Sequence, residues 1–106
     1  MAKYLFIGTY TAEGAKGVLR EGGSGRLAAA RQVVESVGGS VESVYWGFGK
    51  EDFYAIVDLP SHAAAAAISL TIGGSGSTHV RTVPLMTADD IDAAVKLSPS
   101  FRPPGA

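Results

Sequence analysis

Cysteine is absent from the sequence, and an excess of charge of either sign is absent too. Without cysteine, the chain has no disulfide framework, no thiolate metal site and no cysteine nucleophile. Nine Lys and Arg residues are balanced by ten Asp and Glu residues, for a net charge of −1, so the chain lacks the basic excess that binds a phosphate backbone. No apolar run approaches the ~20 residues of a membrane-spanning helix. We therefore expect neither a nucleic-acid partner nor a membrane partner.

The length and the order of patterns indicate one domain. The chain has 106 residues, and domains typically have ~100–150 residues. The residues after Met1 enter a strand-like pattern directly, so we expect no signal peptide and a cytoplasmic protein. We expect a single domain over residues 1–97, followed by a flexible, proline-rich tail over residues 98–106.

Four segments have strand-like patterns, in which alternate residues share a face. They span residues 3–10, 40–48, 52–59 and 78–85. In the first segment both alternating sets are largely apolar, which predicts a strand that is buried on both faces. The short link with glycine between the second and third segments predicts a hairpin. Strict alternation in the second segment places Val41 on the face opposite Val44 and Trp46.

The region between the first two strands has a helical pattern with an interruption. Thr11 begins a short helical turn as its N-cap. The glycines in residues 22–25 predict a flexible break, because each glycine costs about 1 kcal/mol inside a helix relative to alanine. Residues 26–37 then predict a long helix, whose apolar stripe leaves Arg26 to one side. Gly38 supplies a left-handed residue that ends this helix.

Two further helices follow the hairpin. Ser61 begins an alanine-rich helix that ends at Gly73, and a capped helix runs from Thr87 to about Lys96. The order of elements is therefore β-α-β-β-α-β and then a short helix, which is the arrangement of ferredoxin-like folds. We predict an α+β fold with a four-stranded antiparallel sheet and both main helices on one face.

The sheet face without helices still carries apolar side chains. Left open, it would exceed the few hundred Å² of apolar patch that is normal for a monomer. We therefore predict a homodimer, or a higher homo-oligomer, that forms through the sheet face as a dimeric α+β barrel.

Several short motifs stand at defined places in this order. They are Tyr10-Thr11 with Gly14, Gly38-Gly39, Val44-Tyr45-Trp46, Gly49 to Asp52, and Pro60 before the alanine-rich helix. With these motifs, residues from about Met1 to Asp92 resemble the GYD-domain family, small bacterial and archaeal proteins of mostly unassigned function. The resemblance implies a ferredoxin-like, dimeric α+β barrel and supplies no established catalytic residues. The family usually has an aromatic residue before the aspartate of its name motif, where this chain has Glu51.

Three polar residues are candidates for chemistry. Asp52 would act as a general base at a barrel rim, or as a turn residue that accepts backbone N–H bonds, which is the favoured interpretation. His79 and Arg81 share one strand face, which would suit an anionic ligand, with His79 able to move a proton. The favoured alternative for this pair is protection of an edge strand or an ion pair between subunits.

Tyr10, Tyr45 and Trp46 are the aromatic candidates for ligand binding. Because Tyr45 and Trp46 are adjacent in a strand, they point to opposite faces, one toward the helices and the other toward a partner sheet. Such rings would wall a pocket for an aromatic or polyketide-like compound. The alternative, packing in the core and interface, is favoured for each ring taken singly.

The sequence predicts no cofactor and no metal site. The glycine-rich runs at residues 22–25 and 73–76 lack both the sequence and the context of a phosphate-binding loop. His62 and His79 match no spacing of zinc ligands.

Two functions from different classes remain open. The favoured one is a homo-oligomeric module that binds a small apolar or anionic ligand, or acts as a scaffold. The other is a cofactor-independent oxygenase or isomerase of small aromatic compounds, which rests on analogy of fold. Tyr10, Trp46 and His79 would then position the substrate, and Asp52 or His79 would move a proton. No convergent catalytic set is apparent, so the sequence leaves open whether the protein is an enzyme.

Overall fold

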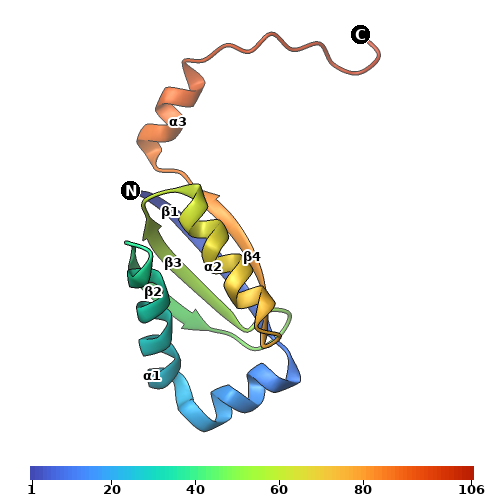
Figure 1. The fold of residues 1–106 in the computed structure, drawn as a ribbon. Coiled ribbons are helices and arrows are strands. Elements are labelled where there is room, and N and C mark those ends of the chain that lie inside the picture. Colours follow the sequence, from blue (N-terminus) through green and yellow to red (C-terminus); the bar gives the residue numbers. More distant parts are fainter.

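The computed structural model describes all 106 residues and has seven regular elements (Figure 1). They are β1 (Ala2–Tyr10), α1 (Ala12–Ser36), β2 (Ser40–Trp46), β3 (Phe53–Leu59), α2 (His62–Gly74), β4 (Thr78–Leu85) and α3 (Ala88–Val95). None of the helices is both long enough and apolar enough to cross a membrane.

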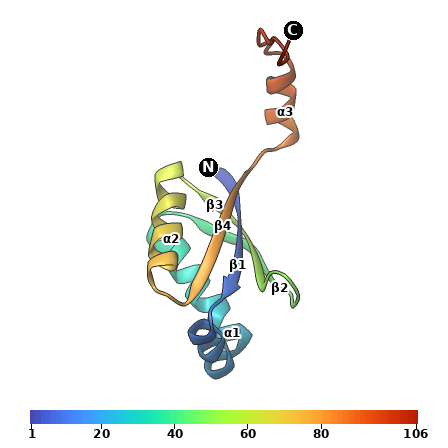
Figure 2. The same ribbon diagram turned by 90° about the vertical axis from the view of Figure 1, so that its right-hand side faces the viewer.

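The four strands form one sheet in the order β2-β3-β1-β4, and every neighbouring pair is antiparallel. Helices α1 and α2 lie on the same side of this sheet, and no helix covers the other side (Figure 2). The α+β class and the four-stranded antiparallel sheet are thereby confirmed, and the arrangement is consistent with a ferredoxin-like fold. We call the uncovered side the open face.

The core lies between the sheet and the two helices. Its largest fully buried side chains are Leu59 and Val57 of β3, which pack with Phe6 of β1, Val34 of α1 and Ile68 of α2. Alternate residues of β1 and β3 point to this core, as a strand requires. Only 13 of the 106 residues are buried, so the single chain leaves much of its apolar surface uncovered.

Helix α1 differs from its prediction at the glycine run. Helical structure begins at Ala12, and the only non-helical residue inside α1 is Gly22, which has a φ of 73° and kinks the helix. The predicted break is therefore confirmed at Gly22, where two helical segments meet at a kink, but it is one residue long and the segment before it is longer than the predicted short turn. The remaining glycines of the run adopt helical conformation despite their weak helix propensity. The predicted left-handed residue after the helix is confirmed at Gly38, which has a φ of 86°.

Strand β2 also departs from strict alternation. The register between β2 and β3 shifts between Val41 and Ser43, where the strand has an irregularity of the β-bulge kind. An extra residue at a bulge reverses the alternation beyond it. Val41 therefore faces the helices together with Val44 and Trp46, and the predicted placement of Val41 on the opposite face is wrong.

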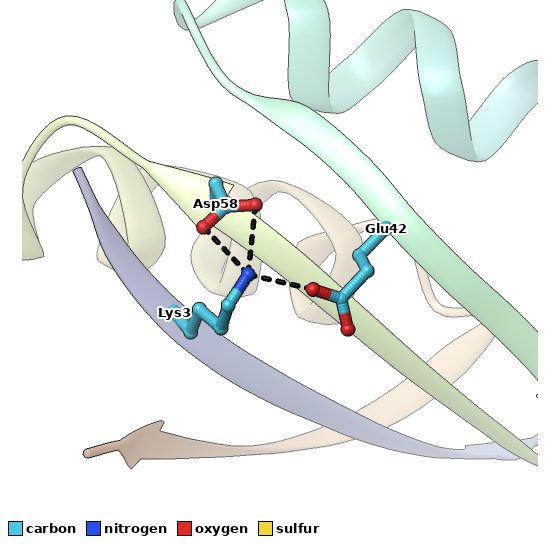
Figure 3. A network of polar contacts seen from close by, with 3 residues as sticks. All are labelled: Lys3, Glu42 and Asp58. Carbon is cyan, nitrogen blue, oxygen red and sulfur yellow. Dashed lines mark hydrogen bonds and ion pairs between the residues drawn. The ribbon is translucent and has the colours of Figure 1, made fainter. Parts of the chain in front are cut away.

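The open face has a charged cluster at one end, an ion pair between Arg81 and Glu51, and apolar side chains between them. Lys3 Nζ lies 2.6 Å from a carboxylate oxygen of Glu42 and 3.0 Å from one of Asp58 (Figure 3). The hydrogen bond to Glu42 has the largest effect on the pKa of Lys3, and the hydrogen bond to Asp58 has the next largest. Both raise this pKa above its ordinary value. These bonds stabilise the fold at pH values below the ordinary lysine pKa of 10.5, and their contribution is lost as pH rises through the raised pKa of Lys3.

Helix α3 projects from the body of the molecule (Figures 1 and 2). A capping box defines its start: the Thr87 side chain accepts from the Asp90 backbone N–H, and the Asp90 side chain accepts from the Thr87 backbone N–H. No residue of α3 is buried, and Ile91 and Val95 lie exposed along it. Its own cap therefore specifies this helix locally, without packing against the sheet.

Candidate functional site

A cavity of about 270 Å³ lies between α1, α2 and the side of the sheet that faces them. Of its 19 lining residues, 14 are hydrophobic. The strands contribute Phe6 and Phe53, and the helices contribute Ala30 of α1 and Ile72 of α2. The small alanine side chains of α1 leave room that larger residues would fill. The arrangement is that of a concave, mostly apolar site for a small molecule.

Two aromatic residues from different strands close one wall of the cavity. Trp46 at the end of β2 donates its indole N–H to the Tyr10 hydroxyl at 3.1 Å. The Tyr10 ring packs on Phe53, with ring centroids 5.4 Å apart. Two of the predicted ligand-binding residues, Tyr10 and Trp46, thus meet at the same cavity. The hydrogen bond holds both rings in place, which suits a preformed site.

Arg26 lines the cavity, although its place beside the apolar stripe of α1 gave it no role in the sequence interpretation. It comes from α1, where Ala30 and Val33 also line the cavity. Residues four and seven positions apart share one helix face. A test of that spacing would have placed Arg26 on the cavity side. Apart from the Tyr10 phenol, its guanidinium is the only ionisable group that lines the cavity.

A second, polar hollow of about 500 Å³ adjoins the cavity. The two spaces share five lining residues, which we call the rim: Tyr10, Arg26, Ser75, Ser77 and Thr78. The rim hydroxyls form a chain, with 2.7 Å between the Oγ atoms of Ser75 and Ser77 and 3.1 Å from Ser77 Oγ to Thr78 Oγ1. The cavity therefore has an apolar body and one polar side.

Asp52 is held by three hydrogen bonds in the connection between β2 and β3. Its Oδ2 accepts a hydrogen bond from the Tyr10 backbone N–H at 2.8 Å. Its own backbone donates to the Gly8 carbonyl at 2.8 Å and accepts from the Gly47 N–H at 2.9 Å. These bonds tie the β2–β3 connection to the end of β1. They agree with the favoured interpretation of Asp52 as a turn residue, and Asp52 does not line the cavity.

His79, Arg81 and Tyr45 lie on the open face, away from the cavity. His79 pairs with Thr9 across the β1–β4 ladder. Arg81 Nη2 lies 3.0 Å from Glu51 Oε1, and the Glu51 side chain is the less exposed partner. Tyr45 stands beside Tyr54 and is 70% exposed. The structure therefore separates these three residues from the cavity that Tyr10 and Trp46 line.

His62 begins α2, and its Nδ1 shares a hydrogen bond with the Tyr4 hydroxyl. The two rings also meet edge to face, with centroids 5.7 Å apart. No group of three or more His, Asp or Glu side chains is placed to hold a metal ion. His62 is itself exposed and caps the hydroxyl end of the buried Tyr4.

Comparison with protein families identifies the chain. The model of the GYD domain matches residues 4–95. The chain belongs to the GYD domain family. In this GYD domain the matched range contains the whole cavity wall and the rim. Glu51, where the resemblance led us to expect an aromatic residue, forms the ion pair with Arg81. Comparisons with curated proteins and with solved structures gave no significant match.

Proposed function

We propose that this GYD domain binds a small, mostly apolar molecule in the cavity between its sheet and its helices. The observation that carries the proposal is the cavity itself, with 14 hydrophobic residues among the 19 that line it. The hydrogen bond between Trp46 and Tyr10 supports it, because it fixes two aromatic walls before any ligand arrives.

Ligand binding is favoured over the alternative, a cofactor-independent oxygenase or isomerase of small aromatic compounds. That chemistry needs a group that moves a proton within reach of the substrate. The two groups predicted to move a proton, His79 and Asp52, do not line the cavity, and the Tyr10 hydroxyl that does is bonded to Trp46. The Asp52 side chain already accepts the Tyr10 N–H. A binding role requires only the walls that are present.

The proposal is tested with N-phenyl-1-naphthylamine, a neutral apolar fluorophore. Trp46 is the only tryptophan and lines the cavity, so a bound probe should take up its excitation energy. Ala30→Phe adds a large side chain to the cavity wall. Ala28→Phe makes the same change at an exposed position of α1 that does not line the cavity.

We expect energy transfer from Trp46 to the probe in the native chain and in Ala28→Phe, and its loss in Ala30→Phe. Circular dichroism checks that both variants fold, and Ala29→Leu is the milder cavity substitution if Ala30→Phe does not fold. Equal probe binding by all variants, or none by the native chain, would contradict the proposal. Native mass spectrometry of freshly purified protein would identify a retained natural ligand.

A second proposal concerns the open face: we infer that the chain forms a homodimer, or a higher homo-oligomer, through it. No helix covers this face (Figure 2). It carries Leu5, Ile56 and Val83 on three neighbouring strands, together with the exposed Tyr45. A second copy would bury these apolar side chains, sheet against sheet, as in a dimeric α+β barrel. This assembly would also give the domain a scaffold role.

A further inference from the structure

The cavity and the polar hollow adjoin each other and have two different chemistries. The apolar part is walled by residues such as Phe6 and Ile72. The hollow has only two hydrophobic residues among its 12 lining residues. They meet along the rim. A molecule that occupies both would have an apolar body and a polar end.

Arg26 lies at the rim, and most of its N–H donors make no hydrogen bond within the chain. Its one ion pair is a single contact of 3.5 Å between its Nη1 and Glu21 Oε2. The Arg26 and Glu21 side chains are 36% and 46% exposed, and ion pairs of this kind stabilise a fold little. A guanidinium has five N–H donors in a fork that matches a carboxylate. Most of those donors are available to a ligand.

The surrounding charges permit an anion at this point. The hollow contains Glu13 and Glu21, together with Arg20 and Arg26, so its charges balance. A carboxylate that displaced Glu21 from Arg26 would leave Glu21 in solvent, where hydration compensates for the lost contact. The Ser75 hydroxyl donates to the Ile72 carbonyl at 2.6 Å and the Ser77 hydroxyl bonds its neighbours, so the Arg26 guanidinium is the donor that this end of the cavity offers to an anion.

We propose, building on the proposed function, that the ligand is a small amphipathic carboxylic acid. Its apolar body fills the cavity, and its carboxylate accepts hydrogen bonds from the Arg26 guanidinium at the rim. Arg26 thus selects among apolar molecules by their head group, since a charged hydrogen bond is stronger than a neutral one.

Two probes with the same skeleton test this selection: 4-phenylbutyrate and 4-phenylbutan-1-ol. Binding to the native chain is followed by the fluorescence of Trp46, which is excited beyond the absorption of a phenyl ring. Arg26→Gln removes the charge at the rim. Arg31→Gln removes a charge from an exposed position of the same helix that does not line the cavity, and it is the matched control.

We expect the native chain and Arg31→Gln to bind the acid about tenfold more tightly than the alcohol, and Arg26→Gln to bind both equally. Equal affinity for the two probes in the native chain would overturn the inference and leave the proposed function standing. A preference for the acid that persists in Arg26→Gln would overturn the role of Arg26. Failure of the acid to bind overturns the inference, and the neutral naphthylamine then decides separately whether the cavity binds apolar molecules.

Discussion

At the scale of single residues, Asp52 connects the hairpin to the wall of the cavity. Its carboxylate accepts the backbone N–H of Tyr10 at 2.8 Å, and the Tyr10 ring lines the cavity. We predict that Asp52→Ala lowers the free energy of unfolding by about 1–3 kcal/mol, because it removes a hydrogen bond to a charged acceptor. Asp52→Asn keeps an acceptor oxygen and should lose less than about 1 kcal/mol. Urea unfolding followed by Trp46 fluorescence measures both changes.

The pair of substitutions also separates the two interpretations of this residue. A structural role makes Asn a close replacement for Asp, whereas a general base loses its function in either variant. An Asp52→Ala variant as stable as the native chain would show that the bond to Tyr10 does not hold the hairpin.

Residue-level chemistry was predictable where it depends on neighbours in the sequence. Because Tyr45 and Trp46 are adjacent in a strand, their placement on opposite faces was predicted and is confirmed. That Trp46 meets Tyr10 was not predictable, since the two residues come from strands that are not adjacent in the sheet. The position of Arg26 was missed because its helix was interpreted by its apolar residues alone, and a charged side chain at the edge of an apolar face was set aside.

At the scale of elements, the start of α1 depends on a glycine that allows close contact. A Cβ atom on Gly14 would lie 2.0 Å from the carbonyl oxygen of Ser77. This same carbonyl accepts the Thr11 backbone N–H at 3.0 Å. The helix start and the loop before β4 therefore meet backbone to backbone, which is the close approach that glycine permits.

We predict opposite effects for the same substitution at two positions of α1. Gly14→Ala forces backbone apart and should lower the free energy of unfolding by about 1–3 kcal/mol. At Gly17 a Cβ meets only an Arg20 side-chain nitrogen at 4.0 Å, so Gly17→Ala should raise the stability by up to about 1 kcal/mol. Thermal unfolding of the two variants measures the difference. Stabilisation by both would mean that the helix start does not press against Ser77.

The strands and helices were largely predictable because each has a local signal. The N-caps predicted at Thr11, Ser61 and Thr87 all accept backbone N–H bonds. The differences occur where a local rule has two outcomes. Glycines tolerate both a break and a helix, and the predicted break is present but confined to Gly22. A strand pattern does not show an inserted residue, so the irregularity after Val41 was invisible.

At the scale of the whole molecule, the open face and α3 are the parts that one chain does not explain. The sequence shows apolar residues on both faces of β1, and this pattern predicted a homo-oligomer. The cavity was not readable, because its volume depends on how far α1 and α2 stand from the sheet. The side chains that set this distance come from six different elements, so no single segment of the sequence predicts the volume of the cavity.

The last prediction concerns assembly. The native chain should have a mass of twice 10.9 kDa, or a higher multiple, by sedimentation equilibrium. Ile56→Lys places a charge in the middle of the open face, and it should shift the mass toward 10.9 kDa because a lysine buried between two sheets has no partner. Leu70→Lys makes the same change on α2, at a side chain that is 76% exposed, and should keep the native mass.

Tyr54→Lys is the second variant on the open face, at a side chain that is already 39% exposed in the single chain. It should dissociate the assembly without unfolding the chain, and circular dichroism distinguishes the two. A native chain that sediments at 10.9 kDa at every concentration would overturn the assembly through the open face. Dissociation by Leu70→Lys, with Ile56→Lys and Tyr54→Lys unaffected, would instead place the contact between copies on the helices. Because the cavity lies on the helix side of the sheet, loss of the assembly through the open face should leave binding of the naphthylamine probe intact.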